Sequence, residues 1–181
     1  MLYFTADQHF GHNNIRHLCK RPYKTIDEMN KALIDNWNSV VTPDDTVYVL
    51  GDFAYKMANR LYQYVHQLHG HKHIIMGNHD RLPRVEYEQQ FETVNNYLEI
   101  DYQDQHIVLF HYPILSWNKR ARGSWMLYGH VHTAGQMRQL DGMKAWNVGV
   151  DANEYKPISF EELEVIMDEK GVQVSDHHIP V

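Results

Sequence analysis

The chain has 181 residues and an ordinary globular composition, with 43% hydrophobic and 22% charged residues. This composition excludes intrinsic disorder, a collagen-like repeat and a coiled coil, and a chain of this length can bury one substantial core. We therefore predict one domain over residues 1–181. Seventeen Lys and Arg against 23 Asp and Glu give a net charge of −6, which argues against a general nucleic-acid coat.

The numbers of cysteine and histidine residues indicate where the protein functions and what chemistry it can perform. The single cysteine, Cys19, excludes an internal disulfide and suits a reducing cytosol. The apolar runs are far shorter than the roughly 18 residues that cross a bilayer, and the first residues resemble no signal peptide. We therefore expect a cytoplasmic protein with no membrane partner. Histidine is frequent, with 14 residues, and it is both the commonest metal ligand and a proton carrier near neutral pH.

The first half of the chain alternates predicted strands and helices. Apolar and β-branched runs predict strands over Leu2–Ala6, Thr46–Leu50 and His73–Met76. Apolar residues at near-helical spacing predict helices over Ile26–Val41 and about Met57–His69. Such alternation implies parallel strands flanked by helices.

The second half is predicted to be rich in strands. After a polar, helical region at Glu86–Phe91, the expected strands are Tyr97–Tyr102, His106–Phe110, Trp125–Tyr128, Gly135–Leu140 and Lys144–Val148. Ser159 followed by two acidic residues predicts a helix start, and that helix ends near Gly171 before a closing strand at Val172–Val174. Two packed sheets with helices outside would accommodate both halves.

Polar residues that could bind a metal or take part in catalysis follow five of the predicted strands. They are Asp7-Gln8-His9, Gly51-Asp52, Gly77-Asn78-His79-Asp80, His111 and Gly129-His130-Val131-His132. In open α/β sheets, ligands bind just outside the carboxyl ends of the strands, where the loops converge. Each signal alone is typical of a turn or a cap, but five at successive strand ends favour a binding site.

This set of motifs resembles the calcineurin-like metallophosphoesterase family. The family pattern is Asp-x-His, Gly-Asp, Gly-Asn-His-Asp/Glu, a single His and Gly-His-x-His, and all five occur here in that order between Asp7 and His132. The resemblance implies an α/β fold, a four-layer αββα sandwich of two mixed β-sheets flanked by helices. It also implies two metal ions at the strand ends. One would be bound by Asp7, His9, Asp52 and His132, and the other by Asp52, Asn78, His111 and His130, with Asp52 bridging the pair.

The chemistry of these ligands suits divalent metals. Imidazole nitrogen and carboxylate oxygen bind Mn, Fe, Zn or Ni, and the lack of clustered cysteines disfavours a structural zinc site. Two divalent ions would bring four positive charges against two negative charges from the aspartates. An acidic chain can therefore present a locally cationic pocket to phosphate.

Two residues of the Gly-Asn-His-Asp motif are candidate catalytic residues. The resemblance implies that His79 lies beside the phosphate without binding metal, as a general acid or a charge stabiliser; the alternative is a histidine that only packs the turn. Asp80 is predicted either to orient His79 or to cap a turn or the next helix.

Two departures from the family pattern narrow the substrate. Protein Ser/Thr phosphatases of the family extend Gly-Asp to Gly-Asp-x-x-Asp-Arg-Gly, whereas here the motif continues Phe53-Ala54-Tyr55-Lys56. The second acid and the arginine are missing, which weakens a protein-phosphatase interpretation and leaves His79 without its usual carboxylate partner.

The second departure is an addition, Phe10-Gly11-His12-Asn13-Asn14-Ile15, which is similar to an extension in a small bacterial and phage branch of the family. His12 and Asn13 are predicted either to contact the phosphate or to fix the loop through side-chain hydrogen bonds. Further candidate substrate contacts, with surface charge or a buried aromatic as the alternative, are Arg16, Arg81, Trp117, Lys119, Arg120 and Arg122. We interpret His66, His69, His71 and His73 as non-ligands, and any metal bound by the tail residues His177 and His178 as stray metal without functional meaning.

The leading hypothesis is a metal-dependent phosphohydrolase in which a metal-bridged hydroxide attacks phosphorus and His79 stabilises the developing charge. Its substrate would be a phosphomonoester or phosphodiester, either a small molecule or a nucleotide. One alternative is a nuclease acting on DNA or RNA, which would need a basic track leading to the metals. Another is a non-catalytic, metal-stabilised scaffold that binds a protein partner.

Overall fold

The fold is taken from a computed structural model of the chain. It describes residues 1–55, 58–132 and 138–172, and the side chains of residues 58–60 and 138 are not described. Within these ranges, no helix combines the length and the apolar character that a membrane crossing requires.

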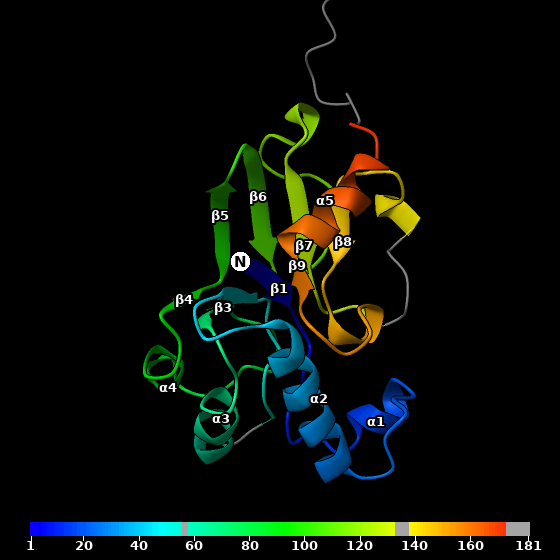
Figure 1. The fold of residues 1–181 in the computed structure, drawn as a ribbon. Coiled ribbons are helices and arrows are strands. Elements are labelled where there is room, and N and C mark those ends of the chain that lie inside the picture. Colours follow the sequence, from blue (N-terminus) through cyan, green and yellow to red (C-terminus); the bar gives the residue numbers. More distant parts are fainter. Residues whose placement is uncertain (56–57, 133–137, 173–181) are drawn as a thin grey trace, which may run out of the picture.

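The larger sheet has five strands in the order β4-β3-β2-β1-β9 (Figure 1). Its members are β1 (Leu2–Thr5), β2 (Thr46–Val49), β3 (His71–Ile75), β4 (Thr93–Asn95) and β9 (Ile158–Ser159). Strands β1 to β4 run parallel, and β9 lies antiparallel to β1. Parallel neighbours bring their carboxyl ends to the same edge of the sheet.

The smaller sheet has the order β5-β6-β7-β8. Its strands are β5 (Tyr97–Tyr102), β6 (Gln105–Phe110), β7 (Trp125–Tyr128) and β8 (Ala145–Asn147). β5 and β6 form an antiparallel pair, whereas β6, β7 and β8 are parallel. The prediction of two mixed sheets with flanking helices is therefore confirmed.

Five α-helices accompany the sheets in the described part of the chain. They are α1 (Ile15–Leu18), α2 (Ile26–Val40), α3 (Ala58–Val65), α4 (Arg84–Glu88) and α5 (Phe160–Asp168). The two longest begin with a capping box, in which Thr25 pairs with Glu28 and Ser159 with Glu162. Each box satisfies backbone N–H groups that a helix start otherwise leaves unpaired. Both helices begin where the sequence predicts.

Three apolar clusters hold the layers together. Met29, Leu33 and Trp37 form the buried face of α2 against the larger sheet, each worth roughly 1.5–3 kcal/mol of burial. A second cluster fills the space between the sheets and includes Phe4 of β1 and Leu127 of β7. A third, which includes Trp117 and Leu140, covers the other face of the smaller sheet.

The differences from the sequence prediction concern short elements. A strand over Gly135–Leu140 is wrong for residues 138–140, which form the 3₁₀ turn η2 (Arg138–Leu140); residues 135–137 lie outside the described residues. Val172 is in no strand, and residues 173–174 lie outside the described residues. Among the described residues the prediction also missed α1, β4 and β9, together with the 3₁₀ turns η1 (Arg120–Arg122) and η3 (Val150–Ala152). Each has two to four residues, too few to display a hydrophobic period.

Candidate metal centre

All five predicted strand exits meet at one edge of the two sheets. Asp7 and His9 follow β1, Asp52 follows β2, Asn78 follows β3, His111 follows β6, and His130 and His132 follow β7. Backbone hydrogen bonds join the exits: Asp7 N–H donates to Gly51 O (3.0 Å), and Gly129 N–H donates to His111 O (3.0 Å). Both sheets therefore supply side chains to the same place.

Asp7, His9 and His132 form a first group, which we call the Asp7 cluster; one candidate ligand atom from each lies within 4.8 Å of the others. Nε2 of His9 is 3.3 Å from Nε2 of His132. Asp7 Oδ2 accepts the backbone N–H of His130 (2.9 Å), but Oδ1 is buried without a hydrogen-bond partner in the described structure. Burial raises the pKa of Asp7 to about 8, so its ionised form requires a neighbouring positive charge at neutral pH.

Asp52, His111 and His130 form a second group, the Asp52 cluster, with the same 4.8 Å limit between candidate ligand atoms. Asn78 completes it, because its Oδ1 lies 3.0 Å from Nε2 of His111 and 3.0 Å from Nδ1 of His130. Asp52 and His111 are buried, whereas His130 is exposed.

Asp52 lies between the two clusters. Its Oδ2 is 3.6 Å from Nε2 of His9 and 3.6 Å from Nε2 of His111. Its Oδ1 accepts the backbone N–H of His79 (2.8 Å). One carboxylate oxygen thus faces both groups, as the predicted bridging ligand would.

The backbone at these positions is constrained. Asp7, His9, Asp52 and His130 all have positive φ, between 52° and 68°, a region that non-glycine residues enter rarely and at a free-energy cost. Gly51 (φ 86°) and Gly77 allow the β2 and β3 exits to touch, because a Cβ on Gly77 would lie 2.3 Å from Asp52 Oδ1. Strained residues of this kind concentrate at functional sites.

The candidate ligand atoms suit a metal because several of them carry lone pairs that face one another with no hydrogen between them. His111 donates its Nδ1–H to Leu50 O (2.7 Å), and burial lowers its pKa, so the neutral ring presents a lone pair at Nε2. That lone pair points at Asn78 Oδ1 and Asp52 Oδ2, which are themselves acceptors. Acceptors held together in this way repel unless a cation lies among them, and this set of N and O donors suits Mn, Fe, Zn or Ni.

His79 and Asp80 lie on the same loop but have different surroundings. The half-buried His79 ring has its centre 5.3 Å from that of His9 and 6.3 Å from that of His12. The described hydrogen bonds of the Asp80 carboxylate come from the backbone N–H groups of Asp52, Phe53 and Gly77. Asp80 therefore joins the β2 and β3 exits, which matches the turn-capping alternative and not orientation of the His79 ring.

The neighbouring residues His12 and Asn13 also have different surroundings. The half-buried His12 ring stacks on Tyr55 with centres 4.0 Å apart, next to His79 and His9. Asn13 Oδ1 instead accepts from Nε (3.2 Å) and Nη2 (2.6 Å) of the buried Arg16. The loop-fixing alternative thus describes Asn13, while His12 lies against the site.

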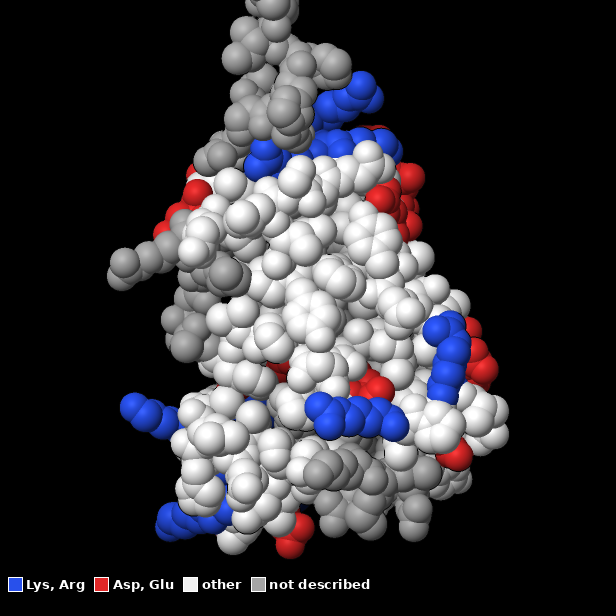
Figure 2. Space-filling view, turned by 180° about the vertical axis from the view of Figure 1, so that it is seen from behind, with Lys and Arg blue, Asp and Glu red and all other residues white. Residues whose placement is uncertain are grey.

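The other predicted substrate contacts mostly lie elsewhere. Lys119 Nζ is 3.1 Å from Nδ1 of His106, near the start of β6 and at the opposite end of that strand from His111. Figure 2 shows Lys and Arg gathered at the upper end of the molecule, where Figure 1 places the turn before β7. Trp117 is buried and its indole N–H donates to Ser124 O, which matches the alternative of a buried aromatic side chain. Of the five cations named from sequence, the exposed Arg81 donates to a predicted ligand residue, through Asn78 O (3.0 Å).

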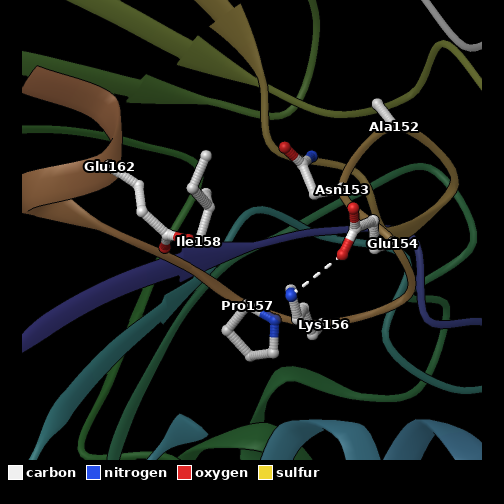
Figure 3. Close-up of a pocket in the computed structure, with 7 residues that line it drawn as sticks. All are labelled: Ala152, Asn153, Glu154, Lys156, Pro157, Ile158 and Glu162. Atoms are coloured by element: carbon white, nitrogen blue, oxygen red, sulfur yellow. Dashed lines mark ion pairs between the residues drawn. The ribbon is translucent and has the colours of Figure 1, made fainter. Parts of the chain in front are cut away.

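The remaining histidines lie off the site where they are described. His69 contacts Val41 O, His71 contacts Glu92 and His73 contacts Thr93. His177 and His178 lie outside the described residues. A separate surface pocket between Ala152 and Glu162 is lined by none of the predicted site residues (Figure 3). Its charged groups have partners, since Lys156 pairs with Glu154 (2.9 Å).

Sequence reasoning missed Asp151 and Arg21. Asp151 Oδ2 is 2.9 Å from Nδ1 of His132, and Arg21 contacts both oxygens of the same carboxylate at 2.7 and 2.8 Å. A signal was available for Asp151, because it follows the predicted strand Lys144–Val148 by three residues, as the other site residues follow theirs. Arg21 follows no strand and carried no such signal.

Comparison with known proteins agrees with the motifs. The family model of the calcineurin-like phosphoesterase superfamily domain matches residues 4–160. An uncharacterised protein of Methanocaldococcus jannaschii is 35% identical over 176 residues, covering 94% of this chain and 92% of that protein. The gene 66 protein of Mycobacterium phage L5 is 26% identical and covers 83% of this chain and 86% of its own length.

A solved structure is similar along nearly the whole chain. The crystal structure of a protein of unknown function from Aquifex aeolicus matches with a TM-score of 0.76 and 28% identity. The match covers 92% of this chain and 98% of that one.

Proposed function

Because the chain belongs to the calcineurin-like phosphoesterase superfamily, it is a metal-dependent phosphoesterase, and we propose that it uses two divalent ions. The Asp7 cluster with Asp52 would hold one ion. The Asp52 cluster with Asn78 would hold the other. The observation that carries this proposal is Asp52 Oδ2, which lies 3.6 Å from an imidazole nitrogen of each cluster.

When bound, divalent ions at these clusters would supply Lewis acidity toward phosphoryl oxygens and would lower the pKa of water toward about 7. The chain's own residues prepare the place for them. Asp7 and Asp52 are buried carboxylates, and Leu50 O fixes the His111 ring with its Nε2 lone pair toward Asn78. The contacts within the chain fix the orientation of these groups, and fixed donor groups are what electrostatic stabilisation of a transition state requires.

We propose that His79 protonates the leaving oxygen or stabilises the charge on the phosphoryl group. Its backbone N–H donates to Asp52 Oδ1, which ties the ring's position to the bridging carboxylate. His12, stacked on Tyr55 beside His79, is the proposed neighbour of the substrate. Asp80 supports the site by joining its loops and has no proposed proton-transfer role.

The proposed substrate is a phosphomonoester or phosphodiester of a small molecule or nucleotide. The predicted location of the protein is the cytoplasm. A nuclease would need a basic track leading to the ions. Of the cations named from sequence, Arg16 is engaged by Asn13, and Lys119 lies at the far end of β6. Arg81 does lie beside the site, where it donates to Asn78 O, but one cation is not a basic track, so these positions and the net charge of −6 favour a small substrate.

The test is hydrolysis of p-nitrophenyl phosphate and bis-p-nitrophenyl phosphate by protein stripped of metal and then supplied with Mn²⁺, Zn²⁺, Ni²⁺ or Fe²⁺. We expect activity only after metal is restored, and the ratio of the two rates separates monoesterase from diesterase. Two equivalents of bound metal per chain are expected. Failure of every metal to restore activity, together with tight binding of a protein partner, would favour the scaffold alternative.

A further inference from the structure

The Asp7 cluster is supported from behind by a buried ion pair that joins distant parts of the chain. Asp151 lies in η3, after β8, and its Oδ2 accepts the Nδ1–H of His132 at 2.9 Å. Arg21, just after α1, donates from Nε to Oδ1 (2.8 Å) and from Nη2 to Oδ2 (2.7 Å) of the same carboxylate. The Arg21 side chain is 0% exposed and that of Asp151 is 6% exposed. A two-point pair with this burial fixes geometry as well as charge.

The same guanidinium also holds the other side of the cluster. Arg21 Nη2 donates to the backbone carbonyl of Asp7 (2.7 Å), and Nη1 donates to that of Gln8 (2.9 Å). The loop that carries Asp7 and His9 is therefore tied to the residue that orients His132. The buried Arg21 guanidinium therefore joins the segments after β1 and β8 directly, and the segment after β7 through Asp151.

The Asp52 cluster has no matching charged support among the described residues. The ring of His111 is oriented by the backbone carbonyl of Leu50, whereas the described contact of the His130 ring is with Asn78, itself a candidate ligand of this cluster. A neutral carbonyl orients an imidazole but adds less negative charge to it than a carboxylate does. His130 is also exposed, so water competes for this cluster.

We propose that Asp151, held in place by Arg21, is a positioning residue that fixes His132 with Nε2 directed at Asp7 and His9, and thereby makes the Asp7 cluster the tighter of two metal sites. This rests on the proposed function in one respect, that the clusters bind divalent ions. A carboxylate on the outer nitrogen sets the tautomer of a ligating histidine and raises its basicity.

One competing interpretation makes Asp151 itself a ligand. Cys19 Sγ, a His132 nitrogen and an Asp151 oxygen lie within 4.8 Å of one another, a spacing compatible with a metal. Both Asp151 oxygens, however, already accept from Arg21, and a cation placed there would face that guanidinium. Cys19→Ala separates the two interpretations, because only a Cys19 site would lose affinity.

The experiment is Mn²⁺ binding by the full chain, measured by equilibrium dialysis with metal analysis, for the wild type, Asp151→Asn and Asp151→Ala. For the wild type we expect two equivalents with different dissociation constants. Asp151→Asn should weaken the tighter site by about 10- to 100-fold, Asp151→Ala by at least as much, and both should leave the weaker site unchanged. Asp45→Asn is the matched control, since Asp45 is a buried carboxylate that bonds Thr42 at the opposite end of β2 from Asp52.

Wild-type affinity at both sites in folded Asp151→Asn would overturn the proposal, as would an equal loss of affinity in Cys19→Ala. Circular dichroism checks folding, and if Asp151→Ala does not fold, the nearly isosteric Asp151→Asn decides. Metal binding is measured without any catalytic turnover, so failure of the proposed function and failure of this inference give different results. A wild type that binds no Mn²⁺ defeats the proposed function, whereas unchanged binding in the Asp151 variants defeats only this inference.

Discussion

The two halves of the candidate site contain similar side chains in different surroundings. The Asp7 cluster is backed by the buried Arg21–Asp151 pair, whereas in the Asp52 cluster the neutral backbone carbonyl of Leu50 orients His111. The first half lies deeper, and the second opens to solvent at His130. Under the proposed function, the difference teaches that the first half would hold its ion in a fixed position and the second would remain accessible to substrate. Asp52, whose Oδ2 faces both halves, is the one carboxylate that the two proposed ions would share.

Removing the shared carboxylate is expected to have the largest effect. Asp52→Ala should abolish binding of both ions and lower kcat/KM by more than about 100-fold, beyond what loss of an outer partner costs. Asp7→Ala should remove one ion only, because Asp7 faces a single cluster. Metal analysis and p-nitrophenyl ester kinetics check both. If Asp52→Ala keeps one ion, the clusters do not share this ligand.

Replacing His79 should lower the turnover number and leave the metal content of both clusters unchanged. In His79→Ala, the group placed to transfer a proton is lost, so kcat should fall by about 10²- to 10⁴-fold. Both metal equivalents should remain, because the described contact between His79 and Asp52 is made by the backbone N–H. A fall in metal content would mean that the ring is a ligand after all. The same dialysis measurement decides this.

The close approach of the β2 and β3 exits can be tested with a pair of glycines. Gly51 and Gly142 both have positive φ, 86° and 76°. A Cβ at Gly51 would lie 2.6 Å from Gly77 Cα and His111 Nδ1, whereas at Gly142 nothing lies within 4 Å. Gly142→Ala should cost only the backbone strain, about 1 kcal/mol of unfolding free energy, and Gly51→Ala about 3 kcal/mol or more.

Urea denaturation measures both variants. Gly51→Ala should also weaken metal binding at the Asp52 cluster, because His111 must move, while Gly142→Ala should bind metal normally. Equal destabilisation by the two substitutions would show that φ alone, and not the contact, matters at Gly51.

The smallest expected effect on activity is that of Asn13→Ala. The substitution removes the acceptor that engages the Arg16 guanidinium, so unfolding free energy should fall by about 1–2 kcal/mol. Neither cluster includes Asn13, so kcat and metal content should stay within about twofold of the wild type. A raised KM with unchanged stability would instead place Asn13 on the phosphate.

Much of this molecule follows from local signals in the sequence. β1, β2, α2 and β7 lie where their apolar patterns predict, because each has four or more residues with a buried face. The convergence of the seven predicted ligand residues has a related cause, since all follow strands whose ends the patterns locate, whereas their role as metal ligands was implied by the family resemblance. The sequence did not predict β9, whose two residues owe their conformation to pairing with β1. Nor did it predict Arg21, which reaches Asp151 across 130 positions of the chain.

The candidate ligands are divided between two sheets, with Asp7, His9, Asp52 and Asn78 on the larger and His111, His130 and His132 on the smaller. The thickness of the apolar filling between the sheets therefore works as a spacer for the whole centre. Changing the bulk of Phe4 or Leu127, neither of which touches solvent, is expected to alter the distance between the candidate ligands of the larger sheet and those of the smaller sheet. Selectivity among ions of different radius could thus be retuned from the interior, without replacing a single coordinating group.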